Sequence, residues 1–519
     1  MMKALAILFD RLITNRLLQW IKVHFAQSGF QKLKSTIHQI FTIRLIIEIV
    51  KKHKKTLYIG VFDLEKAFDK VSRYQLLKKL ALKGIGNCML QVLKKIYSST
   101  YCILIHGKEF SKIFQTFTGI RQGAVSSALL FIGFIDDLID YLEERCAYEP
   151  ILEELHCLLH ADDTLIMSTS RDLFTSKCNH MIDYFEINSL SLNFSKSGFL
   201  IIGGDQNDKK DIYLKNGILE YKKSVIYLGV IVGDSGILSN DTDAYVENKR
   251  SHVTIKYGNF CCSNYLAPIN IKMKVLNTCV SAALTYGCET WGTSKVNKLE
   301  TTFRHGIRTA LSIRGCINNE IVYTESGENP LHIQIKKQQL NFWVNLQKYL
   351  ADHPQHYLNR LINVTNDYEY IRYFKSLVDE YGDPSTCERS LTAEFKENVT
   401  LRIRNAHDED EDSRLGAYFT VNPDLSKPQE DETPEFIRIL KTRYRTGSHN
   451  LMIEKGRMTS INRNDRLCKC QLEIQTLKHV LLLCPLLNDI RTRYRVIDLE
   501  SGINNSDFLL EMERILGVQ

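Results

Sequence analysis

Apolar residues at the start of the chain recur every three or four positions from Leu5 to Trp20. This spacing places them on one face and predicts an amphipathic helix whose other face is polar. A second helix is expected from Ser35 to about His53. The next apolar run, Leu57 to Phe62, has the length and composition of a buried strand. Asp63 follows directly, at the carboxyl end of that strand.

Helical and strand-like patterns alternate through the middle of the chain. Leucines and lysines at helical spacing from Arg73 to Tyr97 are interrupted by Gly84 and Gly86. The elements expected next are a hairpin within Tyr101–Phe117, a helix over Ser126–Arg145, strands at Leu155–His160 and Thr164–Met167, a helix at Leu173–Asn188, and strands at Gly198–Ile202 and Ile226–Val232. Ala161, Asp162 and Asp163 therefore lie in a tight turn between two strands.

Helical patterns dominate from about Thr242 to Leu350, and residues 351–435 are weakly patterned. An acidic run from His407 to Asp412 and a Pro-containing acidic stretch from Asn422 to Pro434 predict a linker before the last domain.

Composition places the chain among folded proteins. Its 519 residues predict roughly three to four domains. With 44% hydrophobic residues, 24% charged residues and 9 Pro, a disordered chain, a collagen-like fibre and a disulfide mini-protein are excluded. The net charge of +7 is concentrated in residues 1–55, where eleven Lys and Arg oppose Asp10 and Glu48. Such a block suits contact with phosphates, or it is a solvated helix face.

The 14 Cys are scattered and lack the regular spacing of a disulfide framework, so we expect reduced thiols in an intracellular protein. The apolar opening is broken by Asp10 and Arg11 and no cleavage pattern follows, which argues against a signal peptide. No apolar run approaches the roughly 20 residues that span a bilayer. The expectation is a soluble protein of the nucleus, the cytoplasm or both, with no membrane partner.

Asp63 and the Asp162–Asp163 pair are the strongest chemical signal in the chain. Carboxylates gathered in one place repel one another, and burial raises their pKa unless a cation balances them. A cluster of three is sensible chiefly as a hard-metal site, and oxygen ligands suit Mg²⁺. The alternative is a set of solvated turn aspartates, which are common.

The sequence around these aspartates resembles reverse transcriptases of non-LTR, LINE-type retrotransposons. The resembling segments are QSGFQKLKST (Gln27–Thr36) before motif A, VFDLEKAFDKV (Val61–Val71) for motif A, GIRQGAVSSALLF (Gly119–Phe131) for motif B, HADDTLIMS (His160–Ser168) for motif C, SLNFSKSGFLI (Ser191–Ile201) for motif D, YLGVIV (Tyr227–Val232) between palm and thumb, LTYGCETW (Leu284–Trp291) in the thumb, and RYRTGSHNL (Arg443–Leu451) before a terminal Cys/His region. The resemblance implies an α+β, right-hand polymerase with fingers, a palm built on an antiparallel sheet, a helical thumb and a small C-terminal zinc-knuckle-like domain.

The resemblance also implies roles for individual residues. Asp63 and Asp162 would hold two Mg²⁺ ions, with help from Asp163 and the carbonyl of Leu64. Such a pair of ions activates the primer 3′-hydroxyl and clamps the triphosphate. The remaining matches are Phe68 as a gate under the nucleotide sugar, Gln122 and Gly123 against the template and incoming base, Arg121 as a phosphate contact, and Lys196 as a proton donor to pyrophosphate. An aromatic residue after a strand is also common core packing, and an exposed Lys also contacts phosphate without transferring a proton.

The chain departs from the family pattern at a few positions. Motif C begins with His160 in place of an aromatic or apolar residue, Ala128 replaces the usual Pro of motif B, and Gln31 stands where Arg often follows Gly-Phe. The chain opens inside the fingers region, without a segment that resembles the endonuclease of full-length elements. It resembles a fragment or a decayed copy of such an element.

Four soft ligands near the end of the chain, Cys468, Cys470, His479 and Cys484, match the number that tetrahedral Zn²⁺ takes. Buried thiols and a helix-face histidine are the alternative, and the family resemblance favours zinc. The arginines around them suit a phosphate track for RNA or target DNA: Arg443, Arg445, Arg457, Arg463, Arg466, Arg491, Arg493 and Arg495.

These observations predict an RNA-directed DNA polymerase whose partners are an RNA template, a DNA primer or target DNA, and dNTPs. The expected parts are fingers and palm at 1–235, a helical thumb at 236–350, a helical connector and acidic linker at 351–435, and a Cys/His nucleic-acid-binding region at 436–519. One alternative is a remnant that only binds nucleic acid, although the three aspartates are intact. Another palm enzyme, such as a nucleotidyl cyclase, would not need the RQG segment or the thumb signature.

Overall fold

The computed structural model describes residues 4–152, 155–205, 208–234, 236, 240–291, 296–428 and 433–518. The chain divides into two compact units. The first comprises Met1–Tyr245, Glu289–Trp291 and Asn345–Lys375, and the second comprises Val246–Cys288, Gly292–Val344 and Ser376–Gln519.

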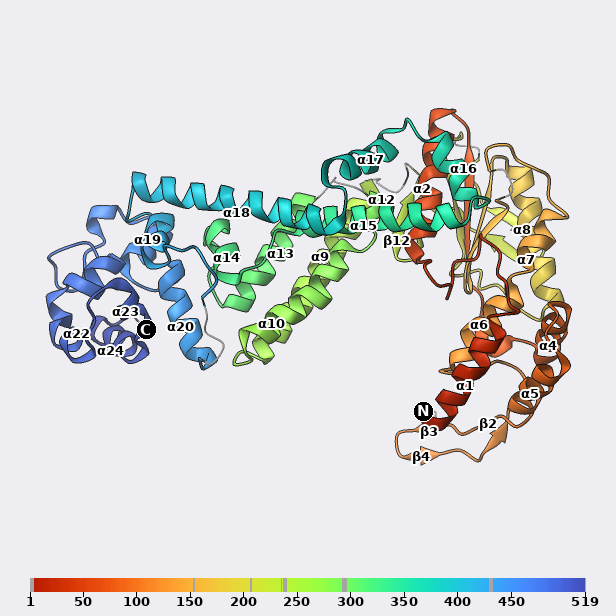
Figure 1. Ribbon diagram of the computed structural model, residues 1–519, viewed down its shortest axis with the longest axis horizontal. Helices are drawn as coiled ribbons and strands as arrows, with labels where there is room; N and C mark the ends of the chain where they lie inside the picture. Colours follow the sequence, from red (N-terminus) through yellow and green to blue (C-terminus); the bar gives the residue numbers. More distant parts are fainter. Residues whose placement is uncertain are drawn as a thin grey trace. The chain divides into compact units, whose positions relative to one another are not determined.

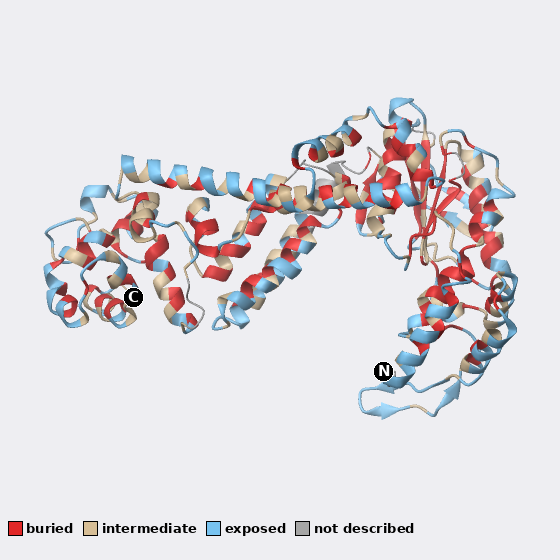
Figure 2. Ribbon diagram, viewed as in Figure 1, coloured by how far each residue is buried: buried red, intermediate tan, exposed pale blue. Residues whose placement is uncertain are grey.

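A four-stranded antiparallel sheet lies at the centre of the first unit (Figure 1). Its strands pair in the order β6-β7-β1-β8. Its strands are β1 (Leu57–Phe62), β6 (Cys157–His160), β7 (Asp163–Ser168) and β8 (Gly198–Ile202). Nearly all residues of these strands are buried, so the sheet is covered on both faces (Figure 2). This is why the strands read as continuous apolar runs, and the strands expected at Leu57–Phe62 and Gly198–Ile202 are confirmed.

The helices assigned wholly to the first unit are α1 (Ala4–Leu17), α2 (Thr36–Lys52), α3 (Ala67–Lys70), α4 (Arg73–Leu82), α5 (Asn87–Ser98), α6 (Val125–Ile135), α7 (Leu138–Glu143), α8 (Arg171–Ile187) and α16 (Tyr357–Val364). Phe174 of α8 stacks against Tyr58 of β1 with ring centroids 5.8 Å apart, which fixes α8 on the sheet. The break expected near Gly84 separates α4 from α5, and Gly84 adopts a φ of 88° there.

The hairpin expected within Tyr101–Phe117 is present as two short paired ladders. They consist of β2 (Tyr101–Cys102) with β5 (Phe114–Gln115) and β3 (Ile105–His106) with β4 (Glu109–Phe110). All four strands are exposed (Figure 2).

The strand expected at Ile226–Val232 is wrong as a single element. The chain forms a hairpin of β11 (Ser224–Tyr227) and β12 (Val230–Gly233). Leu228 and Gly229, which join the two strands, both have positive φ, at 47° and 77°. Two consecutive positive φ angles match the twist of a tight hairpin turn, which an apolar Leu does not signal in sequence. A second small hairpin precedes it, β9 (Ile212–Leu214) with β10 (Gly217–Leu219).

The second unit is helical in its described residues, as the pattern from Thr242 onward predicts. Its helices are α10 (Ile269–Val275), α11 (Ala282–Thr285), α13 (Val296–Leu311), α14 (Asn319–Ser326), α18 (Pro384–Glu409), α19 (Arg414–Val421), α20 (Glu435–Thr446), α21 (Met452–Met458), α22 (Asn488–Tyr494), α23 (Leu499–Asn504) and α24 (Ser506–Leu516), with π-helical turns at Leu276–Ser281 and His479–Leu483 and short 3-10 turns at Arg463–Asp465 and Pro485–Leu487. The helices α9 (Asn240–Ser263), α12 (Cys288–Trp291), α15 (Leu331–Asp352) and α17 (Glu369–Tyr381) contain residues of both units.

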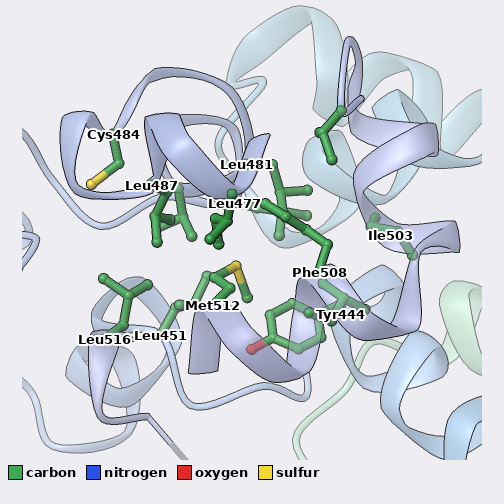
Figure 3. Packing of buried hydrophobic residues seen from close by; sticks show 14 of the residues in the cluster. Tyr444, Leu451, Leu477, Leu481, Cys484, Leu487, Ile503, Phe508, Met512 and Leu516 are labelled. Carbon is green, nitrogen blue, oxygen red and sulfur yellow. The ribbon is translucent and has the colours of Figure 1, made fainter. Parts of the chain in front are cut away.

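The C-terminal part of this unit has its own apolar core (Figure 3). Tyr444 of α20, Leu481, Leu487 and Phe508 of α24 are buried in it together with Cys484. The C-terminal residues therefore fold around side chains that lie next to the Cys/His cluster.

The acidic run His407–Asp412 ends α18 and forms ion pairs. Asp410 and Asp412 pair with Arg463 at 3.2 and 2.9 Å, and Glu411 pairs with Lys478 at 3.3 Å. These residues are therefore tied to the C-terminal part of the same unit. Part of the second expected linker stretch, residues 429–432, lies outside the described residues. The four-part division of the chain stays a prediction.

Among the helices described, none combines the length and the apolar character that crossing a membrane requires.

Candidate active site and Cys/His cluster

Asp63 and the Asp162–Asp163 pair converge at one end of the sheet. β1 pairs with β7 up to Phe62 opposite Thr164, so the next residues along the two strands are Asp63 and Asp163. Strands β6 and β7 are joined by a two-residue turn, Ala161 and Asp162. The sheet register therefore brings together three carboxylates from two distant segments.

The electrostatics of the three aspartates reflect this crowding. Burial, together with the negative charges of Asp162 and Asp63, raises the pKa of Asp163 to about 6. The Lys196 ammonium lies 3.7 Å from Asp63 Oδ2, but 69% of the Lys196 side chain is exposed. Three carboxylates whose negative charges repel one another supply the oxygen ligands that a divalent hard cation requires.

The motif D segment is bonded directly to the end of β1. Asn193 N–H donates to the Asp63 carbonyl at 2.9 Å, and Glu65 N–H donates to the Ser191 carbonyl at 2.9 Å. These two bonds flank Leu64 in an antiparallel bridge, so the carbonyl of Leu64 itself points away from the paired segment. The arrangement leaves that carbonyl available on the other side, as a metal ligand there requires.

The motif B loop is held against α3. Gly119 N–H donates to the Val71 carbonyl and Ile120 N–H to the Phe68 carbonyl. A Cβ on Gly119 would lie 2.8 Å from the Asp69 carbonyl, so only glycine allows this approach. Gln122 Nε2 donates to Asp69 Oδ1 at 2.9 Å.

Gln122 and Gly123 are both exposed. Gly123 has a φ of 80° and open space around its missing Cβ. The pair is therefore presented to solvent beside motif A, free of side-chain cover.

Phe68 and Arg121 each pack against a neighbouring helix. The half-buried Phe68 ring stacks on Phe131 of α6, with centroids 4.5 Å apart and an interplanar angle of 18°. Arg121 donates from Nη2 to the Ile96 carbonyl of α5 at 2.9 Å. Phe131 thus supports the Phe68 ring, and one N–H group of the Arg121 guanidinium is already hydrogen-bonded within the protein.

Arg73 is a residue of the site region that the sequence did not single out. Its guanidinium donates to the carbonyls of Tyr97, Thr116, Thr118 and Gly119, which ties the hairpin base and the motif B loop to α4. Arg73 follows the helix N-cap Ser72, a position where no sequence signal distinguishes it from a solvated arginine.

His160, the departure in motif C, lies 2.8 Å from Ser28 Oγ through its Nδ1. Burial lowers the pKa of His160, and the negative charge of Asp162 raises it by a smaller amount. The structure therefore favours a neutral imidazole that is fixed by a hydroxyl.

The ligand atoms of Cys468, Cys470, His479 and Cys484 lie within 4.8 Å of one another. Cys468 and Cys470 lie in a tight turn, since Gln471 N–H donates to the Cys468 carbonyl and Cys468 N–H donates to the Glu473 carbonyl. His479 begins a π-helical turn that ends at Leu483, directly before Cys484. Two neighbouring segments thus present a compact set of three thiols and an imidazole.

The histidine of this cluster is oriented by a carboxylate. His479 Nε2 lies 3.3 Å from Cys470 Sγ, while its Nδ1 lies 2.8 Å from Glu473 Oε2. A carboxylate on the far nitrogen is the usual arrangement for a metal-binding histidine. Burial raises the pKa of the Cys484 thiol to about 12. The donor set and its orientation fit a tetrahedral zinc ion.

Most of the arginines around this cluster are engaged within the protein. Arg445, Arg457, Arg463 and Arg493 pair with carboxylates. Arg466 and Arg491 donate to backbone carbonyls of Ile461 and Cys484. Six of the eight arginines in the expected phosphate track thus have partners within the fold, and the track itself stays a prediction.

Comparison with known proteins identifies the first part of the chain. Residues 6–232 match the family described as reverse transcriptase (RNA-dependent DNA polymerase). A Pol polyprotein of retrotransposable element R2 from Popillia japonica is 25% identical over 197 residues, which cover 37% of this chain and 28% of the relative. An uncharacterised 149 kDa protein of transposon TX1 from Xenopus laevis is 25% identical over 211 residues, or 38% and 16% of the two chains.

The chain thus matches less than a third of the length of these relatives. Among solved structures, apo telomerase from Candida tropicalis aligns over 68% of this chain and 59% of its own, with 15% identity and a TM-score of 0.33. The family match confirms the expected reverse transcriptase domain over residues 6–232, and the similarity to the R2 and TX1 proteins agrees with the expected kinship to non-LTR retrotransposons.

Proposed function

We propose that this chain is an RNA-directed DNA polymerase that transfers nucleotides from dNTPs to a primer 3′-hydroxyl by a two-metal mechanism. The observation that carries the proposal is the convergence of Asp63, Asp162 and Asp163 at one end of the sheet, within a reverse transcriptase domain. The raised pKa of Asp163 supports it, because a divalent cation would relieve the repulsion among the three carboxylates.

Asp63 and Asp162 would hold two Mg²⁺ ions, with Asp163 assisting and the Leu64 carbonyl completing the ion on the nucleotide side. When bound, these ions would lower the pKa of the primer hydroxyl and stabilise charge on the triphosphate. The chain's own part is to hold the carboxylates in register, which the β1–β7 pairing and the two-residue turn achieve.

Other residues would position the nucleotide and the template. Gln122 and Gly123 are exposed beside motif A, where a template strand and an incoming base can approach the backbone. Phe68, supported by Phe131, would crowd a 2′-hydroxyl and so favour dNTPs. Lys196, next to Asp63, would donate a proton to pyrophosphate, and Arg121 would contact a phosphate.

The parts of a right-hand polymerase are proposed as follows: fingers and palm at 1–235, thumb at 236–350, connector at 351–435 and a nucleic-acid-binding region at 436–519. The Cys468, Cys470, His479 and Cys484 cluster would bind a structural Zn²⁺ that stabilises the last of these parts. The partners would be an RNA template and a DNA primer or target DNA.

Primer extension tests this function directly. The purified full chain, with an RNA template, an annealed DNA primer, dNTPs and Mg²⁺, is expected to lengthen the primer, and Asp162→Asn is expected not to. Wild-type protein that binds the primer–template but fails to extend it would instead support a remnant that only binds nucleic acid.

A further inference from the structure

The turn that carries Asp162 depends on a segment far away in the chain. Ala161, the first residue of this turn, has a φ of 59°, a conformation that residues other than glycine rarely adopt. An alanine there costs free energy that neighbouring contacts must offset.

Gln27 holds Ala161 in place. The Gln27 side chain is fully buried, and its Oε1 accepts the N–H of Ala161 at 3.1 Å and the N–H of Gly29 at 2.8 Å. Only the carbonyl end of an amide accepts hydrogen bonds, so the two donors fix the orientation of the Gln27 amide. One side-chain oxygen thus joins the catalytic turn to the segment before α2.

The backbone of that segment is itself bonded to β6. Ser28 N–H donates to the Leu159 carbonyl at 2.9 Å, and Leu159 N–H donates to the Ala26 carbonyl at 3.0 Å. Gln39 of α2 donates from Nε2 to the Ala26 and Leu159 carbonyls at 2.9 and 3.1 Å. The segment therefore extends the edge of the sheet and approaches the turn from a fixed position.

Gly29 lets the segment come this close. A Cβ at Gly29 would lie 2.3 Å from the Ala161 backbone nitrogen, a separation that no side chain tolerates. Gly29 and the Gln27 amide together form a tight backbone cradle around the first residue of the turn.

We infer that Gln27 is a positioning residue for the metal-binding carboxylates: it holds Ala161 at positive φ, which aims Asp162 and Asp163 toward Asp63. The inference rests on the proposed function for its catalytic meaning, but the contact itself can be tested without catalysis. Gln27 acts through the turn and touches no substrate.

The first measurement follows the contact. In full-length protein labelled with ¹⁵N-alanine, hydrogen exchange at the Ala161 amide is expected to be at least tenfold faster in Gln27→Met than in wild type. Gln39→Met is the matched control, since Gln39 bonds the same segment and β6 but not the turn. Unchanged protection of Ala161 in Gln27→Met, or equal acceleration in both variants, would overturn the inference.

The second measurement follows the carboxylates. Mn²⁺ binding is titrated by electron paramagnetic resonance, and the signal that Asp162→Asn removes is taken as the site. Gln27→Met is expected to weaken that binding about tenfold, whereas Gln39→Met leaves it unchanged. Wild-type affinity in Gln27→Met would sink the positioning role.

A rescue variant separates positioning from general packing. Glycine adopts positive φ without strain, so Ala161→Gly in the Gln27→Met background is expected to restore most of the Mn²⁺ affinity. A failure of this rescue would count against the inference. If Gln27→Met does not fold, Gly29→Ala displaces the same turn by steric clash, and wild-type Mn²⁺ affinity in that variant would also overturn it.

The positioning role of Gln27 and the polymerase function can fail separately. If Gln27→Met accelerates exchange at Ala161 but the wild-type protein never extends a primer, the positioning role of Gln27 stands and the proposed polymerase function is wrong. If the wild-type protein extends a primer and Ala161 is as protected from exchange in Gln27→Met as in wild type, the proposed function stands and the positioning role is wrong.

Discussion

The ammonium of Lys196 lies 3.7 Å from Oδ2 of Asp63, across the junction between the motif D segment and the end of β1. Lys196 is 69% exposed, so this ion pair contributes little stability and can open when phosphates arrive. The pairing brings a lysine of the motif D segment within ion-pair distance of one of the sheet carboxylates, as the proposed role of Lys196 requires.

Replacing Lys196 is expected to slow nucleotide addition without preventing it. Lys196→Ala should reduce the single-turnover rate about a hundredfold, the magnitude usual for loss of a general acid, with a smaller change in the KM for dNTP. Rapid-quench extension assays measure both quantities. A raised KM with an unchanged rate would assign Lys196 to phosphate binding alone, and Lys95, on α5, offers a control substitution.

Removing one of the carboxylates proposed to bind metal should abolish extension and leave the fold intact. Asp63→Ala and Asp162→Ala are expected to show no primer lengthening, because the ions lose a ligand while the buried sheet is unchanged. Circular dichroism and thermal melting should match wild type or show a small gain, since carboxylate repulsion falls. Near-native extension by either variant would show that the metal assignment is wrong.

The ring of Phe68 is expected to select the sugar. Phe68→Ala should admit rNTPs far better than wild type and lower dNTP use modestly, because a ring that crowds the 2′-hydroxyl is gone. Competition between rNTP and dNTP in one extension reaction gives the ratio. Since Phe68 also stacks on Phe131, a lower melting temperature with unchanged sugar selectivity would restrict its role to packing.

The Cys/His cluster is expected to hold one zinc ion. Cys484→Ser should lose one equivalent of zinc by elemental analysis and unfold the C-terminal core locally, because metal binding contributes on the order of 10 kcal/mol to such folds. Extension on a short annealed primer–template should persist, whereas binding to structured RNA should weaken, most clearly at low salt.

Cys387→Ser, a change at a buried thiol outside the cluster, is the control. Zinc-free wild-type protein after careful purification would return the four residues to the alternative of buried thiols and a helix-face histidine.

His356 should make the protein sensitive to acid. Its ring is buried beside Phe25 and Tyr349, its Nδ1 accepts the N–H of Leu358, and burial, aided by the charge of Lys34, lowers its pKa from 6.5 to about 3. Between these values the unfolded chain binds a proton that the folded chain does not, so stability is lost as pH falls from about 6.5.

His356→Gln is expected to remove the share that His356 contributes, about 2 kcal/mol of unfolding free energy between pH 7 and pH 5 at about 1.4 kcal/mol per pH unit below 6.5. His38 and His449, whose pKa values burial lowers to about 4, contribute to the remaining pH dependence. Urea unfolding at pH 7 and pH 5 measures it, with the exposed His106→Gln as control. An unchanged difference in unfolding free energy between the two pH values would show that His356 is not the group responsible.

Much of the local structure could be predicted from the sequence because periodicity is a local property. The run Leu57–Phe62 is a strand because its apolar side chains fill both faces of the sheet. Asp63 follows at the point where the apolar run, and with it the strand, ends. The helix expected from Ser35 to about His53 is present at Thr36–Lys52, with these two residues as its caps. The hairpin at Leu228–Gly229 was missed because tight-turn geometry can be imposed on an apolar residue by the strands that it joins.

The candidate site depends partly on the order of residues in the sequence and partly on contacts between residues far apart in it. The residue types and order of Asp63, Asp162 and Asp163, and of Cys468, Cys470, His479 and Cys484, are present in the sequence and sufficed to nominate both clusters. Only the tertiary structure decided that Gln27 reaches Ala161, 134 positions away, and that the terminal arginines bind carboxylates and carbonyls within the fold. Such contacts depend on where the chain returns in space, and a buried hydrogen bond between distant segments leaves no periodic trace in the sequence that forms it.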